Sequence, residues 1–432
     1  MKILITGASG FIGFHLLTAL LKIGHDVIGC SRRAKELRLT LPSAQWLSCD
    51  FENDTTEDCW IPRLENVDLV VNAVGIIEET FQQSFNNVQT HTPIALFDAA
   101  NTLNIKVIQI SALGADDPQV TVPFLRSKLL ADNHLNQLPV ESITVHPSIV
   151  IGRGGTSTAL FSAMAALPIT PLIANGQQKI QPIHIDDLTS TLLHMIEHWP
   201  GGKHRHQLMG AEVMSMRQLY TTLRDWMQLP SPTFCSVPMP LLRIVAKCNE
   251  KLGGSGLLTQ DTLDLLENAK TPEPSYLKTP PRPIKEALWL NPASPSDTWY
   301  ARLQWIHPLM FWSITFIWIF TGLTSAFFDR ASGYELMASG GIYGWQAGLA
   351  INGGALIDIT LGLLMVRGRH LPWIYSLQIM MMLTYMIGIC FIAPEQWLHP
   401  FGPVTKNFPL IAGTLFLLVT HPTKYKRYLM FS

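Results

Sequence analysis

The stretch ILITGASGFIGFHLLTALLKIGHDVIGCSRR, from Ile3 to Arg33, decides how the first part of the chain folds. A short apolar run ends at Gly7, and Gly10 and Gly13 follow at three-residue intervals before an amphipathic helical pattern. A side chain at such positions would block the tight turn, the approach of the backbone to a pyrophosphate, or the packing of helix on strand. The free N–H groups at the start of the helix favour phosphate. The stretch therefore predicts a strand, a turn and a helix that bind a dinucleotide.

The end of the second predicted strand distinguishes between nucleotides. An NAD site usually has an acidic residue there, which bonds the ribose 2′-hydroxyl, whereas this chain has Ser31, Arg32 and Arg33. Because guanidinium groups form charge-assisted hydrogen bonds with a 2′-phosphate, we expect NADPH (NADP) in preference to NADH. Two solvated surface arginines are the alternative. Asp50, at the end of AQWLSCD, is expected to bond the adenine amino group.

Up to about residue 290, short apolar runs alternate with helix-like segments, which is the pattern of βαβ units. The runs suit parallel strands buried on both faces, and they read MKILIT, DVIGCS, VDLVVNAVG, IKVIQISAL and ESITVHPSIVIG. The first run stops at a glycine, so it is interpreted as a buried strand and not as a signal peptide. The sequence therefore predicts an α/β domain over residues 1–268, with a Rossmann-type doubly wound parallel sheet and a small substrate lobe.

The composition changes after a proline-rich segment, Ala269 to Trp299, which is interpreted as a linker over residues 269–300. Four apolar runs follow and predict an all-α transmembrane domain over residues 301–432, with helices at about 307–328, 345–366, 372–393 and 404–420. The fourth run is shorter than a span needs unless it begins near Val404 and includes Lys406. The low charged fraction, 15%, agrees with a membrane domain. Four helices of a soluble core are the alternative.

Positive charge predicts how the transmembrane domain is oriented. Arg367, Arg369 and His370 lie between the second and third runs, and the basic residues of the last segment, Lys424, Lys426 and Arg427, follow the fourth. The opposite side carries a mixed set of charges. The positive-inside rule therefore places the N-terminal domain and both termini in the cytoplasm, with multi-pass insertion into the inner (plasma) membrane.

Composition also limits the partners. Lys plus Arg number 31 against 32 Asp plus Glu, so nothing indicates a nucleic-acid partner. The six cysteines are scattered without metal-ligand spacing, so we expect no metal site and a reducing environment. The lipid bilayer is the expected partner.

Six motifs together carry a resemblance to known families. They are the glycine run, NAVG (Asn72–Gly75), ISALGA (Ile110–Ala115), RSKLLAD (Arg126–Asp132), HPSIVIGRGG (His146–Gly155) and QPIHIDDL (Gln181–Leu188). The first two thirds of the chain resembles an atypical short-chain dehydrogenase/reductase, most closely the group containing the NADPH-binding accessory subunit of respiratory complex I. The last third is similar to the DoxX-like four-span membrane proteins, notably in GALIDITLGLLM and GPVTKNFPLIAG. Together they resemble a bacterial fusion of a reductase domain with a DoxX-like anchor.

The resemblance implies a set of cofactor-binding residues along the carboxyl edge of the sheet. These residues are Gly7, Ser9, Gly10, Phe11, Ile12, Gly13, Ser31, Arg32, Arg33, Asp50, Ala73, Val74, Gly75, Lys128, Pro147, Ser148 and Ile149. Pro147, Ser148 and Ile149 match the loop that borders the nicotinamide ring.

The resemblance also implies a catalytic set, and here the chain departs from the pattern. Active reductases of this superfamily use Ser, Tyr and Lys, with the tyrosine four residues before the lysine. Ser111 matches the serine and Lys128 the lysine, but Phe124 stands in the place of the tyrosine. Phenylalanine has no hydroxyl and cannot donate a proton. Lys128 is still expected to hold the ribose, and Ser111 to bond a substrate oxygen.

Two further motifs have structural interpretations. His146 stands where relatives commonly have arginine, and we interpret it as a neutral packing residue rather than a catalytic one. His184 and Asp186 resemble a motif that ties the substrate lobe to the sheet, with Asp186 or Asp187 capping the following helix. The lobe itself is expected from about Gly152 to Asn268.

The second predicted span contains an ionisable residue, Asp358. At such depth a carboxyl group indicates function or interhelical bonding, and Thr384 or Asn352 are expected as partners in the second case. Gly353, Gly354 and Gly362 are expected to allow close helix packing.

Two functions remain open from the sequence. The first is a membrane-tethered NADPH-dependent oxidoreductase that acts on an apolar substrate such as a quinone or a lipid-like carbonyl. The second is a non-catalytic NAD(P)H-binding module that stabilises or senses for a membrane redox complex of the respiratory type.

Overall fold

The computed structural model describes the chain except for residues 81, 174, 252–259, 261–262, 265–279 and 422–432. The basic residues expected after the fourth span, Lys424, Lys426 and Arg427, therefore lie outside the described residues. The chain divides into two compact units, one from Met1 to Ala301 and one beginning at Arg302.

The first unit is built on a seven-stranded parallel sheet with the strand order β11-β6-β5-β4-β1-β2-β3. The strands are β1 (Lys2–Thr6), β2 (Asp26–Cys30), β3 (Gln45–Leu47), β4 (Leu69–Asn72), β5 (Lys106–Ile110), β6 (Ser142–Pro147) and β11 (Lys203–Leu208). Their apolar residues are buried because helices cover both faces of the sheet. The order reverses between β1 and β4, and ligands of such sheets bind at this switch point. The predicted doubly wound Rossmann-type fold is confirmed.

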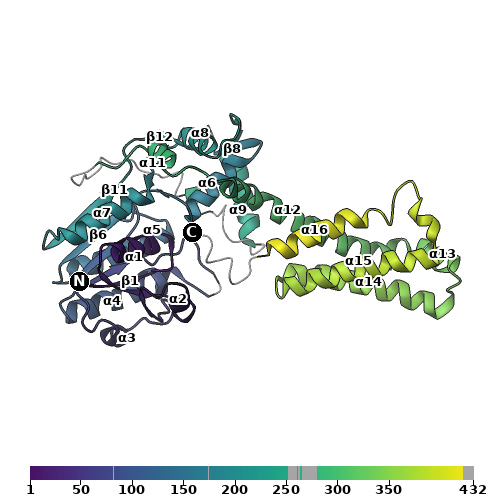
Figure 1. Ribbon diagram of the computed structural model, residues 1–432, viewed down its shortest axis with the longest axis horizontal. Helices are drawn as coiled ribbons and strands as arrows, with labels where there is room; N and C mark the ends of the chain where they lie inside the picture. Colours follow the sequence, from purple (N-terminus) through teal and green to yellow (C-terminus); the bar gives the residue numbers. More distant parts are fainter. Residues whose placement is uncertain (81, 174, 252–259, 261–262, 265–279, 422–432) are drawn as a thin grey trace. The chain divides into compact units, whose positions relative to one another are not determined.

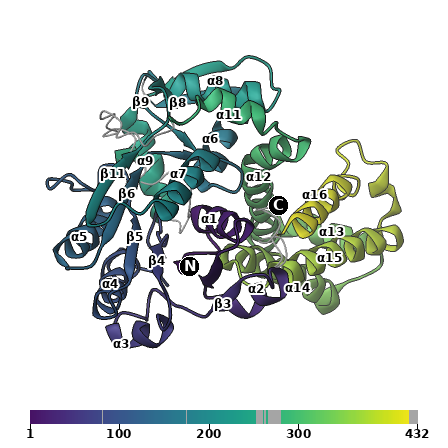
Figure 2. The same cartoon turned by 60° about the vertical axis from the view of Figure 1, so that its left-hand side comes forward.

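Helices lie on both sides of this sheet. Figure 2 shows α4 (Thr92–Thr102) and α5 (Pro123–Gln137) on one side, and α1 (Phe11–Lys22) with α7 (Ile185–Glu197) on the other. A π-helical turn, η2 (Asn86–His91), leads into α4 and packs on α5. The shorter helices of this region are α2 (Ala34–Thr40), α3 (Glu57–Trp60) and η1 (Ile61–Arg63).

The remaining elements of the first unit form the smaller lobe. In Figure 1, α6 (Thr156–Ala166), α8 (Met216–Trp226) and α11 (Ile284–Leu290) lie together there. Three short strand pairs complete it: β7 (Val150–Ile151) with β10 (Ile183–His184), β9 (Lys179–Ile180) with β12 (Met214–Ser215), and β8 (Ile169–Ile173) with β13 (Thr233–Val237). The helix α9 (Met239–Lys251) follows β13. Apolar side chains from α6, α8 and α11 share one core.

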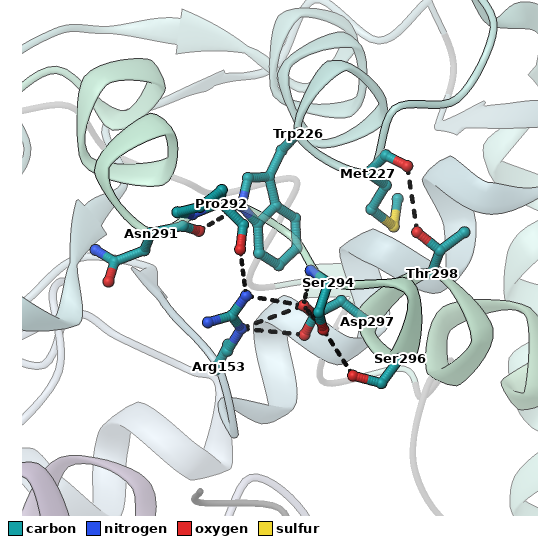
Figure 3. Close-up of polar contacts among 9 residues, drawn as sticks. All are labelled: Arg153, Trp226, Met227, Asn291, Pro292, Ser294, Ser296, Asp297 and Thr298. Atoms are coloured by element: carbon teal, nitrogen blue, oxygen red, sulfur yellow. Dashed lines mark hydrogen bonds and ion pairs between the residues drawn. The ribbon is translucent and has the colours of Figure 1, made fainter.

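Part of the segment expected as a linker differs from that expectation. Residues 265–279 lie outside the described residues, but Ile284, Leu288 and Ala301 are buried in the core of the lobe. Figure 3 shows how Arg153 holds the end of this segment: its guanidinium binds Asp297 at 2.9 Å and the carbonyl of Pro292 at 2.5 Å. The apolar periodicity of IKEALWL, placed among prolines, is the signal that indicates this packed helix.

The second unit is helical. Its elements are α12 (Pro295–Leu323, which begins in the first unit), η3 (Thr324–Phe328), α13 (Arg330–Ser339), α14 (Gly344–Arg367), α15 (Leu371–Ile392), η4 (Pro394–Trp397) and α16 (Asn407–Thr420). Within the described residues, three helices are long and apolar enough to cross a membrane: Pro295–Phe328, Gly344–Arg367 and Leu371–Ile392. The fourth expected span is the 14-residue α16, because Val404 to Lys406 form turns instead of extending the helix.

The helices of this unit pack closely at one of the three glycines singled out from the sequence. A Cβ on Gly362 would lie 2.5 Å from Ile319 Cγ1, so α14 and α12 meet there. Gly353 has open space around its Cα, and close packing at that residue was therefore a wrong prediction.

The predicted interhelical bonding of Asp358 has a different partner from those expected. Tyr385 donates its hydroxyl to Asp358 Oδ1 at 3.0 Å, from α15 to α14. Asn352 instead accepts from Arg330, and Thr384 donates to the carbonyl of Met380 on its own helix.

Candidate functional site

The glycine turn between β1 and α1 forms a cradle that side chains would fill. Gly7 has a positive φ of 66°, and the Gly10 amide donates to its carbonyl at 2.8 Å. A Cβ on Gly13 would clash with the Gly7 carbonyl, and a Cβ on Gly7 would lie 2.7 Å from the carbonyl of Ala73. The first turn of α1, which includes Phe11 and Ile12, therefore packs next to the backbone of the glycine turn, with no side chain between them. This arrangement fits a pyrophosphate, because unblocked N–H groups at a helix start bind anions.

The end of β2 brings together part of the expected ribose site. Ser9 and Ser31 share a hydrogen bond of 2.9 Å between their hydroxyls, so the glycine turn and the end of β2 are adjacent. Arg32 is exposed, with Nη2 3.4 Å from Gln83 Oε1, and Arg33 is half-buried at the start of α2.

Asp50 lies beyond β3, and its carboxylate is occupied within its own loop. It accepts a hydrogen bond from the amide of Glu52 at 3.2 Å and another from Asn53 Nδ2 at 2.7 Å. A carboxylate has about four acceptor positions, so both oxygens keep capacity for an adenine amino group.

The loop after β4 meets the helix α5 at Gly75. A Cβ on Gly75 would lie 3.3 Å from both Lys128 Nζ and Gln89 Oε1. Gln89, on the π-helical turn, accepts from the Ile76 amide at 3.1 Å and donates to Ser127 Oγ at 2.9 Å. Gln89 therefore fixes the expected cofactor loop, Ala73 to Gly75, relative to α5.

Lys128 is only 5% exposed, and its ammonium group has few partners. Nζ donates to the carbonyl of Ile110 at 3.3 Å and lies 5.9 Å from the centre of the Phe124 ring. Burial lowers the pKa of Lys128 to about 8, although the nearby Asp132 carboxyl opposes this shift. The Phe124 ring packs edge-on against Phe85 at 6.2 Å, so an aromatic contact occupies the position of the usual proton donor.

The Ser111 hydroxyl is hydrogen-bonded within the protein. It donates to Asp132 Oδ2, and Asp132 is fully buried. The other carboxylate oxygen, Oδ1, accepts from Gln109 Nε2 at 3.1 Å. The Ser111 hydroxyl hydrogen is thus directed into the protein.

Ser111 and Asp132 belong to a set of hydrogen-bonded side chains that crosses the sheet, which we call the polar network. Asn72 lies in register with both Thr6 and Gln109, so their side chains share one face. Thr6 donates to Asn72 Oδ1 at 2.6 Å, and Asn72 donates to Gln109 Oε1 at 2.7 Å. The polar network consists of Thr6, Asn72, Gln109, Asp132 and Ser111.

His146 also faces Asp132. It is buried, as expected of a packing residue, but its Nε2 lies 3.2 Å from Asp132 Oδ2 without the alignment of a hydrogen bond. A polar contact therefore accompanies the packing role inferred from the sequence.

The segment Pro147–Ser148–Ile149 connects the sheet to the lobe. Ser148 donates its hydroxyl to the Gln181 carbonyl at 2.6 Å, and its amide donates to Leu208. The Ile149 carbonyl accepts from the Ile183 amide at 2.9 Å. The loop Pro147–Ile149, which is expected to border the nicotinamide, is therefore hydrogen-bonded both to β11 of the sheet and to the segment Gln181–Ile183 of the lobe.

The predicted cap of α7 was assigned to the wrong residue. His184 is the N-cap residue, and its Nδ1 accepts from the Asp186 amide at 3.3 Å. Asp187 instead pairs with Arg282 at 2.7 Å, and Asp186 accepts from Asn291 at 3.1 Å. The side chain of His184 lowers the pKa of Asp186 to about 2, with further help from Asn291 and Arg282 and against the effect of burial. Both carboxylates therefore bind the segment that precedes α12.

The sequence analysis gave no role to Asp132, Gln89 or Gln109. Gln109 is a polar residue inside the apolar strand KVIQI, and Asp132 follows Lys128 by four residues on the same helical face. Both patterns were visible in the sequence, whereas the π-helical turn that carries Gln89 has no comparable signal.

Comparison with known proteins agrees with this architecture. Residues 3–209 match the NAD dependent epimerase/dehydratase family, and residues 315–415 match the DoxX-like family. The chain is 26% identical over 255 residues to "NADH dehydrogenase [ubiquinone] 1 alpha subcomplex subunit 9, mitochondrial" of Arabidopsis thaliana, covering 56% of this chain and 61% of that protein. It is also 26% identical over 195 residues to "Ceramide reductase" of Caulobacter vibrioides, covering 44% of this chain and 59% of that protein. The chain thus spans about 60% of the length of these curated relatives.

The chain is also similar to a solved structure. The UDP-glucuronic acid 4-epimerase of Bacillus cereus, in complex with UDP-glucuronic acid and NAD, is 18% identical with a TM-score of 0.49, covering 71% of this chain and 100% of its own.

The first unit is therefore an NAD(P)-binding domain of the epimerase and short-chain dehydrogenase/reductase type. The second unit carries a DoxX-like domain with apolar helices suited to a lipid bilayer.

Proposed function

We propose that the chain is a membrane-tethered, NADPH-dependent oxidoreductase that acts on an apolar substrate such as a quinone or a lipid-like carbonyl. The observation that carries the proposal is the position of Lys128, a buried ammonium group beside Gly75 at the end of the cofactor cradle. NADPH would supply a hydride when it is bound there. Lys128 would hold the ribose through its N–H groups, which have one protein acceptor among the described residues.

The preference for NADPH rests on Arg32 and Arg33 beside the Ser9–Ser31 hydrogen bond. We expect fluorescence titration of the detergent-solubilised protein to give tighter binding of NADPH than of NADH. Replacing both arginines with alanine should weaken NADPH binding and leave NADH binding nearly unchanged, because only NADPH carries the 2′-phosphate. Lys35→Ala is a matched control, since Lys35 is an exposed cation two residues after Arg33. Equal effects on both nucleotides would contradict the assignment.

The apolar substrate is supported by the membrane domain and by the names of the relatives. One is described as a subunit of a ubiquinone-linked NADH dehydrogenase and the other as a ceramide reductase. NADPH oxidation followed with a short-chain quinone and with a long-chain ketone tests both substrate types. If no acceptor is reduced while NADPH binds tightly, the oxidoreductase proposal is wrong.

A second candidate is a non-catalytic NADPH-binding module for a membrane redox complex. It is favoured by Phe124 in place of the usual tyrosine and by the direction of the Ser111 hydroxyl. The same titration and turnover assay separates the two functions, because the module would bind NADPH without oxidising it.

We further propose that the protein is a multi-pass protein of the inner membrane, with α16 as a fourth span and with both termini in the cytoplasm. The proposal is supported by the basic loop at Arg367, Arg369 and His370, between α14 and α15. Reporter fusions at both ends and in the loop after α15 would test it. Reporters at the two ends that indicate opposite sides of the membrane would exclude an even number of spans.

A further inference from the structure

The site contains three side chains at the positions of the usual catalytic set, but two of them cannot give a proton to a substrate. Phe124 has no hydroxyl. The hydroxyl of Ser111 donates to Asp132 Oδ2, on the buried side of the site. Moving this hydrogen towards a substrate would leave a fully buried carboxylate without one of its two donors, which costs about 1–3 kcal/mol.

Lys128 is the remaining donor. An ammonium group has three N–H bonds, and among the described residues one of them has a protein acceptor, the Ile110 carbonyl at 3.3 Å. The group lies against Gly75, which has no side chain to cover it. Lys128 therefore has N–H bonds to offer towards the cofactor loop.

We propose that Lys128 is the proton donor of this site and that the electron acceptor it serves is a quinone. This inference rests on the oxidoreductase function proposed above and names its substrate class.

The reaction balances without any further reactant. One hydride from NADPH reduces the quinone by two electrons and leaves a hydroquinone monoanion and NADP⁺. One proton then passes from the Lys128 ammonium to the phenolate oxygen, and the neutral amine regains a proton from water. The net reaction consumes one quinone, one NADPH and one proton, and yields one hydroquinone and one NADP⁺.

The class of acceptor follows from the aromatic contact at Phe124. Because a ring occupies the place of the hydroxyl, the usual O–H donor is missing, and we expect proton transfer to follow hydride transfer. Hydride transfer to a ketone without a proton gives an alkoxide. An alkoxide is roughly as basic as hydroxide, whose conjugate acid has a pKa of about 15.7, so a ketone is a poor acceptor when the proton comes second. A hydroquinone is a phenol with a pKa near that of tyrosine, about 10, so its anion persists until Lys128 protonates it.

The charge state of Lys128 depends on few neighbours. Asp132, one turn further along α5, is the charged group that acts on it, and it favours the ammonium form. The other groups around Nζ carry no charge: the Ile110 carbonyl of β5, Gly75 after β4, Gln89 of η2 and the Phe124 ring of α5. Since burial brings the pKa of Lys128 to about 8, the ammonium form is depleted above pH 8, and quinone turnover should fall there.

The test uses the full-length protein in detergent and three forms: wild type, Lys128→Arg and Phe124→Tyr. Arginine keeps the positive charge that meets the cofactor but stays protonated at all accessible pH values. Each form is titrated with NADPH by fluorescence, and NADPH oxidation is then followed from pH 6 to 10 with a short-chain quinone and with a long-chain ketone.

Wild type is expected to reduce the quinone at least about 100-fold faster than the ketone, the lower end of what a general acid contributes. Lys128→Arg should still bind NADPH measurably, because it keeps the positive charge, and at saturating NADPH it should lose quinone turnover by about tenfold or more and lose the decline above pH 8. Phe124→Tyr should raise ketone turnover by about tenfold or more, because it restores a hydroxyl four residues before the lysine.

Each contrary result has a distinct meaning. Unchanged turnover and an unchanged pH profile in Lys128→Arg would overturn Lys128 as the proton donor. Ketone turnover equal to quinone turnover in wild type would overturn the substrate class. Tight NADPH binding without reduction of either acceptor by wild type would reject the proposed oxidoreductase function itself, and this inference with it.

Discussion

Replacing Asp132 with asparagine is expected to destabilise the first unit strongly, although the two side chains have nearly the same shape. Asp132 is fully buried and accepts hydrogen bonds from Gln109 at one oxygen and from Ser111 at the other. Asparagine keeps one acceptor oxygen for Gln109, but its amide nitrogen cannot accept from the Ser111 hydroxyl, so the Ser111 hydrogen loses its acceptor.

The expected cost has two parts. One hydrogen bond to a carboxylate is lost, which is worth about 1.5–3 kcal/mol, and a buried donor is left without a partner, which costs about 1–3 kcal/mol. The sum predicts a loss of about 2.5–6 kcal/mol in the free energy of unfolding. His146, whose Nε2 lies 3.2 Å from Asp132 Oδ2, loses its charged neighbour as well.

The measurement is proteolytic susceptibility of the full-length protein over a urea series, with fragments of the first unit followed by mass. Asp98→Asn is the matched control. Like Asp132, Asp98 lies next to a histidine: its carboxylate is 2.6 Å from His134. Unlike Asp132, however, both of these side chains are about one-third exposed. Exposed ion pairs contribute about 0–1 kcal/mol, so this control should change stability little. If Asp132→Asn is no more destabilising than Asp98→Asn, the reasoning about the polar network is refuted.

Three further predictions concern other parts of the first unit. Gly13→Ala should abolish NADPH binding in the fluorescence titration, since its Cβ would meet the Gly7 carbonyl, whereas Gly388→Ala, in open space, should not. Lys128 has a pKa of about 8 in the folded protein and about 10.5 in the unfolded chain, so between these pH values the folded protein binds fewer protons. The free energy of unfolding should therefore rise with pH over this range. Urea unfolding measured across this pH range should show the rise in wild type and not in Lys128→Met. Arg153→Met should remove the ion pair with Asp297, which contributes about 1 kcal/mol to the stability of this segment. Limited proteolysis of residues 291–299 should therefore become faster. An unchanged rate would show that the ion pair contributes nothing.

Much of the fold of the first unit could be predicted because its signals are local. The glycine spacing from Gly7 to Gly13 and the short β-branched runs indicate a parallel sheet directly, and the sheet has the expected order reversal. The segment before α12 was misread because proline density suggested a linker, whereas Ile284 and Leu288 are buried by partners far away in the sequence. The apolar periodicity of IKEALWL was the local signal for this helix, and the prolines around it outweighed that signal.

The candidate site was predictable to a similar extent. The absence of the tyrosine at Phe124 was evident from the sequence, and so was the position of Lys128. The direction of the Ser111 hydroxyl was not, because it depends on the distance between β5 and α5. The partner of Asp358 was also missed: Tyr385 and Thr384 are adjacent in the sequence, and only the rotation of α15 decides which of them faces α14.

The polar network has a consequence for how the chain folds. Its hydrogen-bonded partners are separated by 66, 37 and 23 residues along the chain, so none of these bonds forms early by local closure. During synthesis the Asn72 amide finds its acceptor, Gln109, once β5 is made, whereas the Gln109 amide has its acceptor, Asp132, only after α5 has been made. An arrangement in which β1, β4 and β5 are not neighbours would bury at least one of these groups unpaired. The network therefore stabilises only the native order of these three strands, and it forms late in the assembly of the sheet.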